Sequence, residues 1–494
     1  MRQPRIDKGP WFLVNTLNSL NVFEVSRAIA VLQRNKNAVQ QSGAAARIWR
    51  AILPRILTAK SGDERNRVLA NSLILHFRPV RVPAKALKYT HTFGLGGMSL
   101  VLVLMLMGTG LLMMFVYDPS PERAYQSIVT MQQDILFGRL IRGVHYWSAN
   151  LLIAVALVHM LRVFLTGAFH APRQSNWLIG LGLLFLILVS GFTGYLLPWD
   201  QISYWAITIC TEMLSYVPGI GLALQRVILG GGEIGPATMI NFYATHTTMV
   251  PILLIMLMTW HFWRIRLAGG VVIPKDSGAD PEAGMEYVPF IHNLLLREIV
   301  VALILVAFVV VVAILFGAPL SEPANSGLSP NPTKAPWYFL GFQELLLHFH
   351  PVFAIFVIPM MVAIAVVSVP YLRYDTDLSG NWFLSPKGRH MATVAAGTAL
   401  LVTPLWVLVD EFVVGPGGWL PDAAPIISNG LLPCAALLVG IIGFYILLKK
   451  RFAASRNEAV QALFVLLVVA FTALTATGVW FRGASMALVW PWQM

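Results

Sequence analysis

The chain has 494 residues, of which 57% are hydrophobic and only 12% are charged. Apolar runs of about 20 residues recur along it, which excludes a soluble globular protein and predicts a polytopic membrane protein. The two cysteines, Cys210 and Cys434, lie at the edge of an apolar run and inside one, so a disulfide framework is not expected.

Residues 1–92 form a basic extension before the first long apolar run, without a recognisable signal peptide. Its stretch PWFLVNTLNSLNVFEVSRAIAVLQ is interrupted by polar residues, which favours an amphipathic helix on the cytoplasmic membrane surface. A helix docked on a partner subunit fits the same pattern, and both alternatives stay open.

The rest of the chain predicts an all-α polytopic membrane bundle of about nine helices. The expected spans are residues 94–117, 141–166, 176–197, 240–263, 297–316, 351–370, 391–413, 430–448 and 458–481. With a cytoplasmic N-terminus, most of the 35 Lys and Arg residues fall on the cytoplasmic side. The net charge of +12 therefore follows the positive-inside rule and does not indicate nucleic-acid binding. A multi-pass location in the cell's inner membrane is expected.

Residues 93–266 hold four spans, and histidines occur in pairs on the second and the fourth. His145 and His159 are 14 residues apart, and His246 and His261 are 15 apart. At 3.6 residues per turn, each pair lies on one face of its helix, separated by roughly 21–22 Å. Two such helices facing each other predict two stacked metal centres, and iron porphyrins with two axial imidazoles fit that geometry. A structural histidine in helix packing is the alternative.

Glycines repeat this spacing on the first and third spans. Gly96 and Gly110 are 14 residues apart, and so are Gly180 and Gly194. A glycine lets a flat macrocycle approach the helix backbone, so these four positions are predicted to line the porphyrins. Close helix packing through small residues is the alternative.

Two arginines lie within one turn of the histidines. Arg142 precedes His145 by three residues, and Arg162 follows His159 by three. Each is predicted to pair with a haem propionate, although arginines near membrane boundaries also commonly extend toward water.

Three segments follow the four-span core. Residues 267–296 are a cytoplasmic linker, and residues 297–414 hold three spans and a proline-rich loop. Residues 415–494 hold two further spans that carry no recognisable chemistry, and we expect them to serve assembly or partner contact.

Three stretches of the core resemble cytochrome b of the bc-type quinol:cytochrome c oxidoreductase complexes. They are RGVHYWSANLLIAVALVHMLRVFLTGAF, GFTGYLLPWDQISYWAITI and GGGEIGPATMINFYATH. The 15-residue histidine step and PWDQ are closer to the chloroplast-type short cytochrome b. Residues 297–414 resemble its partner, subunit IV, here fused to the same chain, so that the resemblance covers about residues 85–414.

The resemblance implies two b haems among the first four spans, one ligated by His145 and His246 near the outer face and one by His159 and His261 near the cytoplasmic face. It also implies that quinol is oxidised near the outer face. One electron then passes to a Rieske iron–sulfur protein and on to a c-type cytochrome. The other crosses the two haems to reduce quinone near the cytoplasmic face, with proton translocation.

The same resemblance sets the expected partners. The sequence has neither a cysteine cluster nor a CxxCH motif, so the iron–sulfur centre and the c-type haem are expected on partner subunits. A homodimeric complex in contact with membrane lipid is implied, with no nucleic acid. The quinone type is open, and menaquinone is a candidate.

The outer quinol site departs from the family pattern. The family has PEWY there, whereas this chain has Pro336 before Trp337 and Tyr338. Proline cannot accept the quinol proton. Glu344 is the nearest replacement and His348 a candidate proton relay, because an ionisable group in an apolar stretch usually has a function. A solvated edge residue is the alternative for Glu344.

Two other departures concern the haems. Asn241 takes the place of an arginine five residues before the third ligand, which leaves one propionate contact in doubt. Gly94 takes the place of the cysteine that binds an extra haem in the chloroplast-type protein, so no covalent haem is expected on this chain.

The inner quinone site has weaker signals. Arg266 follows His261 by five residues, and His91, Lys275 and His292 fall on the same side, although all four are ordinary residues for a membrane boundary. At the outer end, Asp200 and Trp199 of PWDQ are expected to shape the pocket and not to transfer protons.

Two rival functions remain. A dihaem quinone-linked anchor of another oxidoreductase would keep the haems without splitting the electron pair. A transporter with structural histidines would lack a reducible b-type spectrum.

Overall fold

The computed structural model describes residues 81–274, 286–375, 379–415 and 417–493, which belong to one compact unit that begins at Val80. The first 80 residues of the predicted basic extension and Lys275 lie outside the described residues, so their predictions stay untested.

Nine helices of the described part are long and apolar enough to cross a membrane, which confirms the predicted helical bundle. They are α6 (Leu95–Met114), α8 (Gly138–Leu165), α9 (Gln174–Leu196), α12 with η3 and α13 (Pro236–Ala244, Thr245–Met249, Val250–Leu267), η4 with α14 (Ile291–Leu295, Leu296–Phe316), η5 with α16 and η6 (Phe353–Val357, Ile358–Ser368, Val369–Tyr371), α17 with η7 (Pro386–Val409, Asp410–Val414), η8 with α18 (Ile427–Leu431, Leu432–Arg451) and α19 (Arg456–Trp480).

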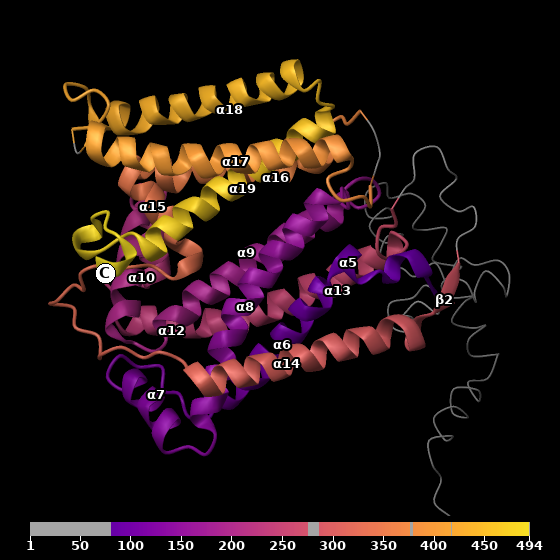
Figure 1. The fold of residues 1–494 in the computed structure, drawn as a ribbon. Helices are drawn as coiled ribbons and strands as arrows, with labels where there is room; N and C mark the ends of the chain where they lie inside the picture. Colours follow the sequence, from indigo (N-terminus) through magenta and orange to yellow (C-terminus); the bar gives the residue numbers. More distant parts are fainter. Residues whose placement is uncertain (1–80, 275–285, 376–378, 416, 494) are drawn as a thin grey trace, which may run out of the picture. The chain divides into compact units, whose positions relative to one another are not determined.

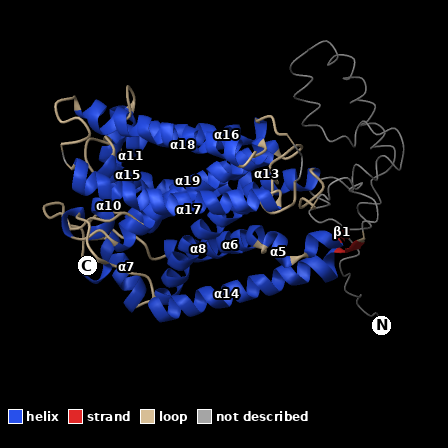
Figure 2. Cartoon of the chain, turned by 45° about the horizontal axis from the view of Figure 1, so that its top comes forward, coloured by secondary structure: helices blue, strands red, loops and turns tan. Residues whose placement is uncertain are grey.

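Short elements precede, connect and follow these spans. They are η2 (Ala84–Leu87), α5 (Tyr89–Thr92), α7 (Ala124–Gln133), α10 (Gln201–Leu214), α11 (Gly221–Leu229), α15 (Trp337–His348), η9 (Ala484–Met486) and η10 (Pro491–Gln493). Strands β1 (Arg81–Pro83) and β2 (Tyr287–Pro289) pair antiparallel. Figures 1 and 2 place α7, α10 and α15 at one end of the bundle, called here the α15 end, and α5 with the strands at the other, called the α5 end.

The core that positions the site is formed by α6, α8, α9 and α13, with α14 packed against α6 and α8 (Figure 1). Leu102, Ile153, Val250 and Val309 from different helices are almost fully buried in it. The opposite face of α14 leaves large apolar side chains exposed: Leu303, Ile304, Phe308, Val311, Ile314 and Leu315. An apolar surface of that kind suits lipid and not water.

Five π-helical turns lie in the spans that the structure describes, at η3, η4, η5, η7 and η8. Three of them, η3, η5 and η8, are followed two residues later by a proline within the helix: Pro251, Pro359 and Pro433. Proline lacks an N–H and its ring clashes with the carbonyl four residues earlier, so a wider turn relieves the helix at that point.

The last two spans are part of the bundle and not an appendage. α19 packs against α17 and α15. It also reaches α8, because the Phe464 ring stacks on Phe164 at 3.8 Å and the Gln461 amide donates to the carbonyls of Phe164 and Leu165. The C-terminal region is therefore built into the same core as the histidine helices.

The α15 end is tied together by Asp200. Its carboxylate accepts from Ser203 N at 3.0 Å, which caps α10, and from Ser321 N at 3.0 Å in the proline-rich loop. The side chain thus joins the PWDQ turn to the loop before α15, and its pocket-shaping role stays a prediction.

Replacing Asp200 by Ala removes both acceptors and leaves a buried N–H of Ser203 unsatisfied. We expect a loss of about 1–3 kcal/mol, seen as a lower thermal midpoint of the purified protein. Glu212→Ala on the exposed face of α10 is the matched control, and an equal midpoint for the two variants would contradict this role.

Candidate functional site

The four paired histidines lie where two helices of the core face each other. His145 and His159 are on α8, while His246 is in the π-turn η3 and His261 is on α13. The rings of His145 and His246 have centroids 6.2 Å apart. Two metal–nitrogen bonds of about 2 Å, together with the distance from each coordinating nitrogen to its own ring centroid, span a separation of that size.

Each imidazole at this pair is held through Nδ1. The Thr109 hydroxyl donates to Met105 O at 2.7 Å and so accepts from His145 Nδ1 at 3.0 Å. His246 Nδ1 lies 3.0 Å from Ser190 O, which can only accept. Both rings therefore carry the proton on Nδ1 and keep the Nε2 lone pair available for a metal, the arrangement that orients metal-binding histidines.

Each of the four predicted glycines faces one of the four histidines. A Cβ built on Gly96 would lie 3.6 Å from Cε1 of His159, and on Gly110 it would lie 3.3 Å from Cε1 of His145. On the other helix pair, the distances are 3.5 Å from Gly180 to His261 and 2.5 Å from Gly194 to His246.

The glycines therefore give room first to the imidazole edges. The room predicted for a flat macrocycle is therefore, first of all, room for the histidine side chains. An alanine at Gly194 would collide with the His246 ring, which has to keep its position to bind a metal.

The π-turn explains the unequal spacing of the two histidine pairs. Val250 N donates to Thr245 O, five residues back, so η3 holds one more residue than an α-helical turn. The 15 residues from His246 to His261 can thus match the 14 between their facing glycines, Gly180 and Gly194.

The donor set suits a porphyrin better than a bare ion. Among the residues that the structure describes, no group of three or more His, Cys, Asp or Glu side chains could hold a metal. A porphyrin supplies four equatorial nitrogens itself and needs only two axial ligands, so pairs of histidines fit it.

The two arginines beside the histidines have protein partners. Arg142 donates to the carbonyls of Ala318 and Pro319 at 2.9 and 2.7 Å, which fixes the loop after α14. Arg162 donates through Nε to His91 O at 2.8 Å, and its buried Nη2 has no hydrogen-bond partner. That orphaned nitrogen suits a carboxylate of a bound group, whereas Arg142 has a structural role and its propionate contact stays a prediction.

Asn241 does not replace the missing arginine. Its amide nitrogen lies 3.4 Å from the carbonyls of Val227 and Ile228, at the end of α11.

Trp337 and Tyr338 open α15 beside the histidine core. Trp337 Nε1 donates to Asn150 on α8 at 2.8 Å. A Cβ on Gly191 of α9 would lie 3.0 Å from the Tyr338 hydroxyl, so Tyr338 packs one turn from Gly194. Burial raises the pKa of Tyr338 well above its ordinary value, so the phenol stays protonated.

Glu344 is not a solvated edge residue, and that alternative is wrong. It is fully buried and paired with Arg482, whose Nη2 lies 2.6 Å from Oε1, and with His348 at 3.2 Å. Burial alone would raise the pKa of Glu344, but the hydrogen bonds from His348 and Arg482 and their charges hold it below its ordinary value. A closed-off, paired carboxylate is a poor direct acceptor for a quinol proton.

Three partners of this cluster were not found from the sequence: Asp410, Glu411 and Arg482. His348 Nδ1 lies 2.7 Å from Asp410, and Arg482 Nη1 lies 2.9 Å from Glu411. Each is a charged residue at the end of an apolar span, which is the one signal that could have identified it.

The known proteins with which the chain shares sequence agree on one family. The family described as Cytochrome b/b6/petB matches residues 82–269. Cytochrome b6 of Synechococcus sp. (strain CC9605) is 40% identical over 175 residues, which cover 35% of this chain and 80% of that protein. Cytochrome b6 of Synechococcus sp. (strain JA-3-3Ab) is 41% identical over 175 residues, covering 35% and 81%. The chain belongs to the cytochrome b/b6 family.

Membership makes this chain a multi-pass electron-transfer subunit of the bc type, and the family implies haem b, typically two. A chain of a solved structure described as Hyperthermophilic respiratory Complex III shares the fold, with a TM-score of 0.58 and 22% identity. The match covers 78% of this chain and 95% of that one. A short cytochrome b6 fused to a subunit-IV-like region is consistent with the length of the chain.

At the α5 end, His91 is buried, and its Nε2 lies 2.6 Å from Val272 O. Burial lowers the pKa of His91, with the carbonyl opposing that shift, so the ring is a neutral packing element. His292 is exposed, and Arg266 lies in the last turn of α13. None of these three residues lines the cavity that opens at this end.

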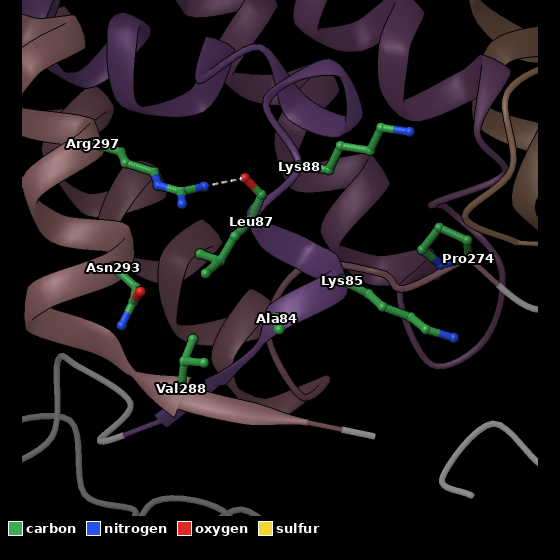
Figure 3. Close-up of a pocket in the computed structure, with 8 residues that line it drawn as sticks. All are labelled: Ala84, Lys85, Leu87, Lys88, Pro274, Val288, Asn293 and Arg297. Atoms are coloured by element: carbon green, nitrogen blue, oxygen red, sulfur yellow. Dashed lines mark hydrogen bonds between the residues drawn. The ribbon is translucent and has the colours of Figure 1, made fainter. Parts of the chain in front are cut away.

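A cavity of about 640 Å³ opens at this end between η2, α14 and the segment after α13 (Figure 3). Its lining includes Lys85, Lys88 and Arg297, with no acidic residue, and Arg297 donates to Leu87 O at 2.8 Å. The basic lining agrees with a cytoplasmic position for the α5 end.

Gly194→Ala tests the pairing of glycines with histidines. The new methyl group displaces the His246 ring, and we expect bound haem to fall from two per chain toward one, measured as pyridine haemochrome per polypeptide. Gly97→Ala is the matched control, since a Cβ there meets nothing within 4 Å. Equal haem content in both variants would contradict the assignment.

Proposed function

We propose that this chain is the cytochrome b subunit of a quinol-oxidising bc-type complex in the inner membrane. The α15 end would lie at the outer face of the membrane, and the N-terminus would lie in the cytoplasm. The observation that carries the proposal is the one-to-one match of four histidines with four glycines across two helix pairs. No ordinary packing requirement explains why all four matches fall at two levels of the same bundle.

His145 and His246 would hold one haem b near the outer face, and His159 and His261 would hold the other near the cytoplasmic face. Gly96, Gly110, Gly180 and Gly194 would give the imidazoles and the macrocycle room, and Arg162 would pair with a propionate. Bound there, the two haems would supply one-electron transfer between the two faces of the membrane.

The quinol site would lie beside Trp337 and Tyr338. Tyr338 packs on α9 at Gly191, one turn from the glycine that faces His246, which brings this motif close to the outer haem position. One electron of quinol would leave to a Rieske iron–sulfur partner and then to a c-type cytochrome. The other would cross the membrane to a quinone site near the cytoplasmic face, where Arg266 is the candidate contact, and protons would be released outside.

The partners follow from what the chain lacks in sequence. Two separated cysteines can build neither an iron–sulfur cluster nor a c-type haem attachment, so both groups belong to partner subunits. We place the chain in a homodimeric complex within lipid, and menaquinone is the candidate quinone.

A dihaem quinone-linked anchor without electron splitting is the second candidate. Pro336 in place of the family's glutamate favours it, together with the locked state of Glu344. Both candidates share the haems and differ in where the two electrons of one quinol go.

An oxidant pulse separates the two candidates. In the complex purified from native membranes with its inner site blocked, quinol and an oxidant for the Rieske partner are added together. If the two electrons take different routes, oxidising the partner increases reduction of the b haems, because the first electron can leave only then. In a linear anchor the oxidant lowers b-haem reduction, and that result would exclude electron splitting.

The same pulse on complex stripped of its Rieske partner is the control. We expect b-haem reduction through the outer site to disappear there, while the dithionite-reduced spectrum stays unchanged.

A further inference from the structure

A cluster of five ionisable side chains lies at the α15 end, where α15, the end of α17 and the segment after α19 meet. Glu344, His348 and Arg482 have side chains at most 1% exposed. Asp410 is 15% exposed and Glu411 is 29% exposed. The cluster therefore runs from a centre without solvent to two carboxylates that reach the surface.

Arg482 bridges two of the carboxylates. Its Nη2 and Nε donate to Glu344 Oε1 at 2.6 and 3.0 Å, and Nη1 donates to Glu411 at 2.9 Å and to Met486 O at 2.9 Å. Every nitrogen of the guanidinium is thus engaged. A fixed fork of this kind holds a carboxylate in its ionised form.

The backbone around Arg482 is fixed too. Arg482 forms a β-bridge with Leu488, and Val489 N donates to Phe481 O at 2.9 Å. A Cβ on Gly341 would lie 2.7 Å from the Phe471 ring, so α15 and α19 approach closely just before the ion pair. The segment after the last span, α19, thereby places a cation beside α15.

His348 connects the buried centre to the surface. Its Nε2 lies 3.2 Å from Glu344 Oε1 and its Nδ1 lies 2.7 Å from Asp410 Oδ2. Burial alone would lower the pKa of His348, but the hydrogen bonds and charges of Asp410 and Glu344 raise it above its ordinary value. The ring can donate at both nitrogens only as imidazolium.

Charge balance gives the same result. The cluster has three carboxylates against one guanidinium, and Lys334 is the further cation that acts on Glu344. With Glu344 held ionised, a proton on His348 offsets the excess negative charge, and His348 is the group of the cluster that can bind and release it near neutral pH.

We propose that Arg482 is a positioning residue of the outer quinol site and that His348 and Asp410 form its proton exit to the aqueous surface. The proposal rests on the proposed function, and it assigns a task to the C-terminal spans. Glu344 is then the fixed anion of the site and not its proton acceptor.

The transfer balances without any electron moving. The imidazolium releases its Nδ1 proton to Asp410, which passes it to water, and a neutral ring with its proton on Nε2 remains. The ring turns about the Cβ–Cγ bond, Nδ1 binds a proton from the quinol side, and the ring turns back. One proton therefore enters and one leaves, and the starting imidazolium is restored.

The test uses the complete complex and measures quinol:cytochrome c turnover against pH, haem content and thermal midpoint. Asp410→Asn keeps an acceptor for His348 but carries no proton. We expect turnover to fall at least about tenfold with both haems retained. The apparent pKa of turnover should fall by about one unit, because the charge that raises the pKa of His348 is gone. Asp422→Asn, an exposed acid of the neighbouring loop, is the matched control and should match the wild type.

A second pair of variants separates positioning from packing. Arg482→Gln removes the guanidinium that faces Glu344 and leaves His348 as its nearest cation, so the pKa of Glu344 rises and a protonated-carboxyl band appears in the infrared spectrum at a higher pH than in the wild type. In the double variant Glu344→Gln, Arg482→Gln, that band is absent and the thermal midpoint recovers. Turnover should stay low in the double variant with a shifted pH profile, because His348 has lost its fixed anion.

Recovery of wild-type turnover and pH profile in the double variant would overturn the proposal, and so would an unchanged profile in Asp410→Asn. A wild-type complex that binds both haems yet does not oxidise quinol would instead overturn the proposed function and the exit route with it. The infrared band needs no quinol, so it would still decide whether Arg482 keeps Glu344 ionised.

Discussion

The fit of an imidazole edge against a glycine, made four times, is the constraint on which the core depends. It ties α6 to α8 and α9 to α13, and it fixes the rotation of each helix about its axis. A helix turned by one residue would replace glycine with a side chain and lose the contact. Nδ1 of His145 donates to the Thr109 hydroxyl, and Nδ1 of His246 donates to the Ser190 carbonyl. These hydrogen bonds leave Nε2 of each ring available to bind a metal.

The same constraint explains an irregularity elsewhere in the chain. The fourth span carries one extra residue between its histidines, and the π-turn at Thr245–Met249 accommodates it next to Pro251.

At the α15 end, the buried pair of Glu344 and Arg482 is a second fixed point. Removing one partner of such a pair typically costs about 3–5 kcal/mol, because the other charge stays buried. The C-terminal spans are therefore bound to α15 by more than apolar contact.

Sequence reasoning was sufficient where the signal was periodic. The nine spans and the 14-residue spacing that the glycine pairs share with His145 and His159 follow from helical periodicity and apolar length, which are local properties. It failed where partners are far apart in the chain. Arg482 lies 138 residues from Glu344, and no spacing rule links them. The position of Arg142 beside His145 also did not indicate that its guanidinium donates to the carbonyls of residues 318 and 319. The fused C-terminal spans had no pattern to compare with, so their role emerged only from packing.

The most direct test of the central claim is electron paramagnetic resonance of the oxidised complex together with haem b per chain. The account predicts two haems b per polypeptide, both low-spin with two imidazole ligands, and the loss of one signal in His246→Ala but not in His390→Ala, whose histidine is exposed on α17. A single haem, a high-spin signal in the wild type, or two intact signals in His246→Ala would contradict it.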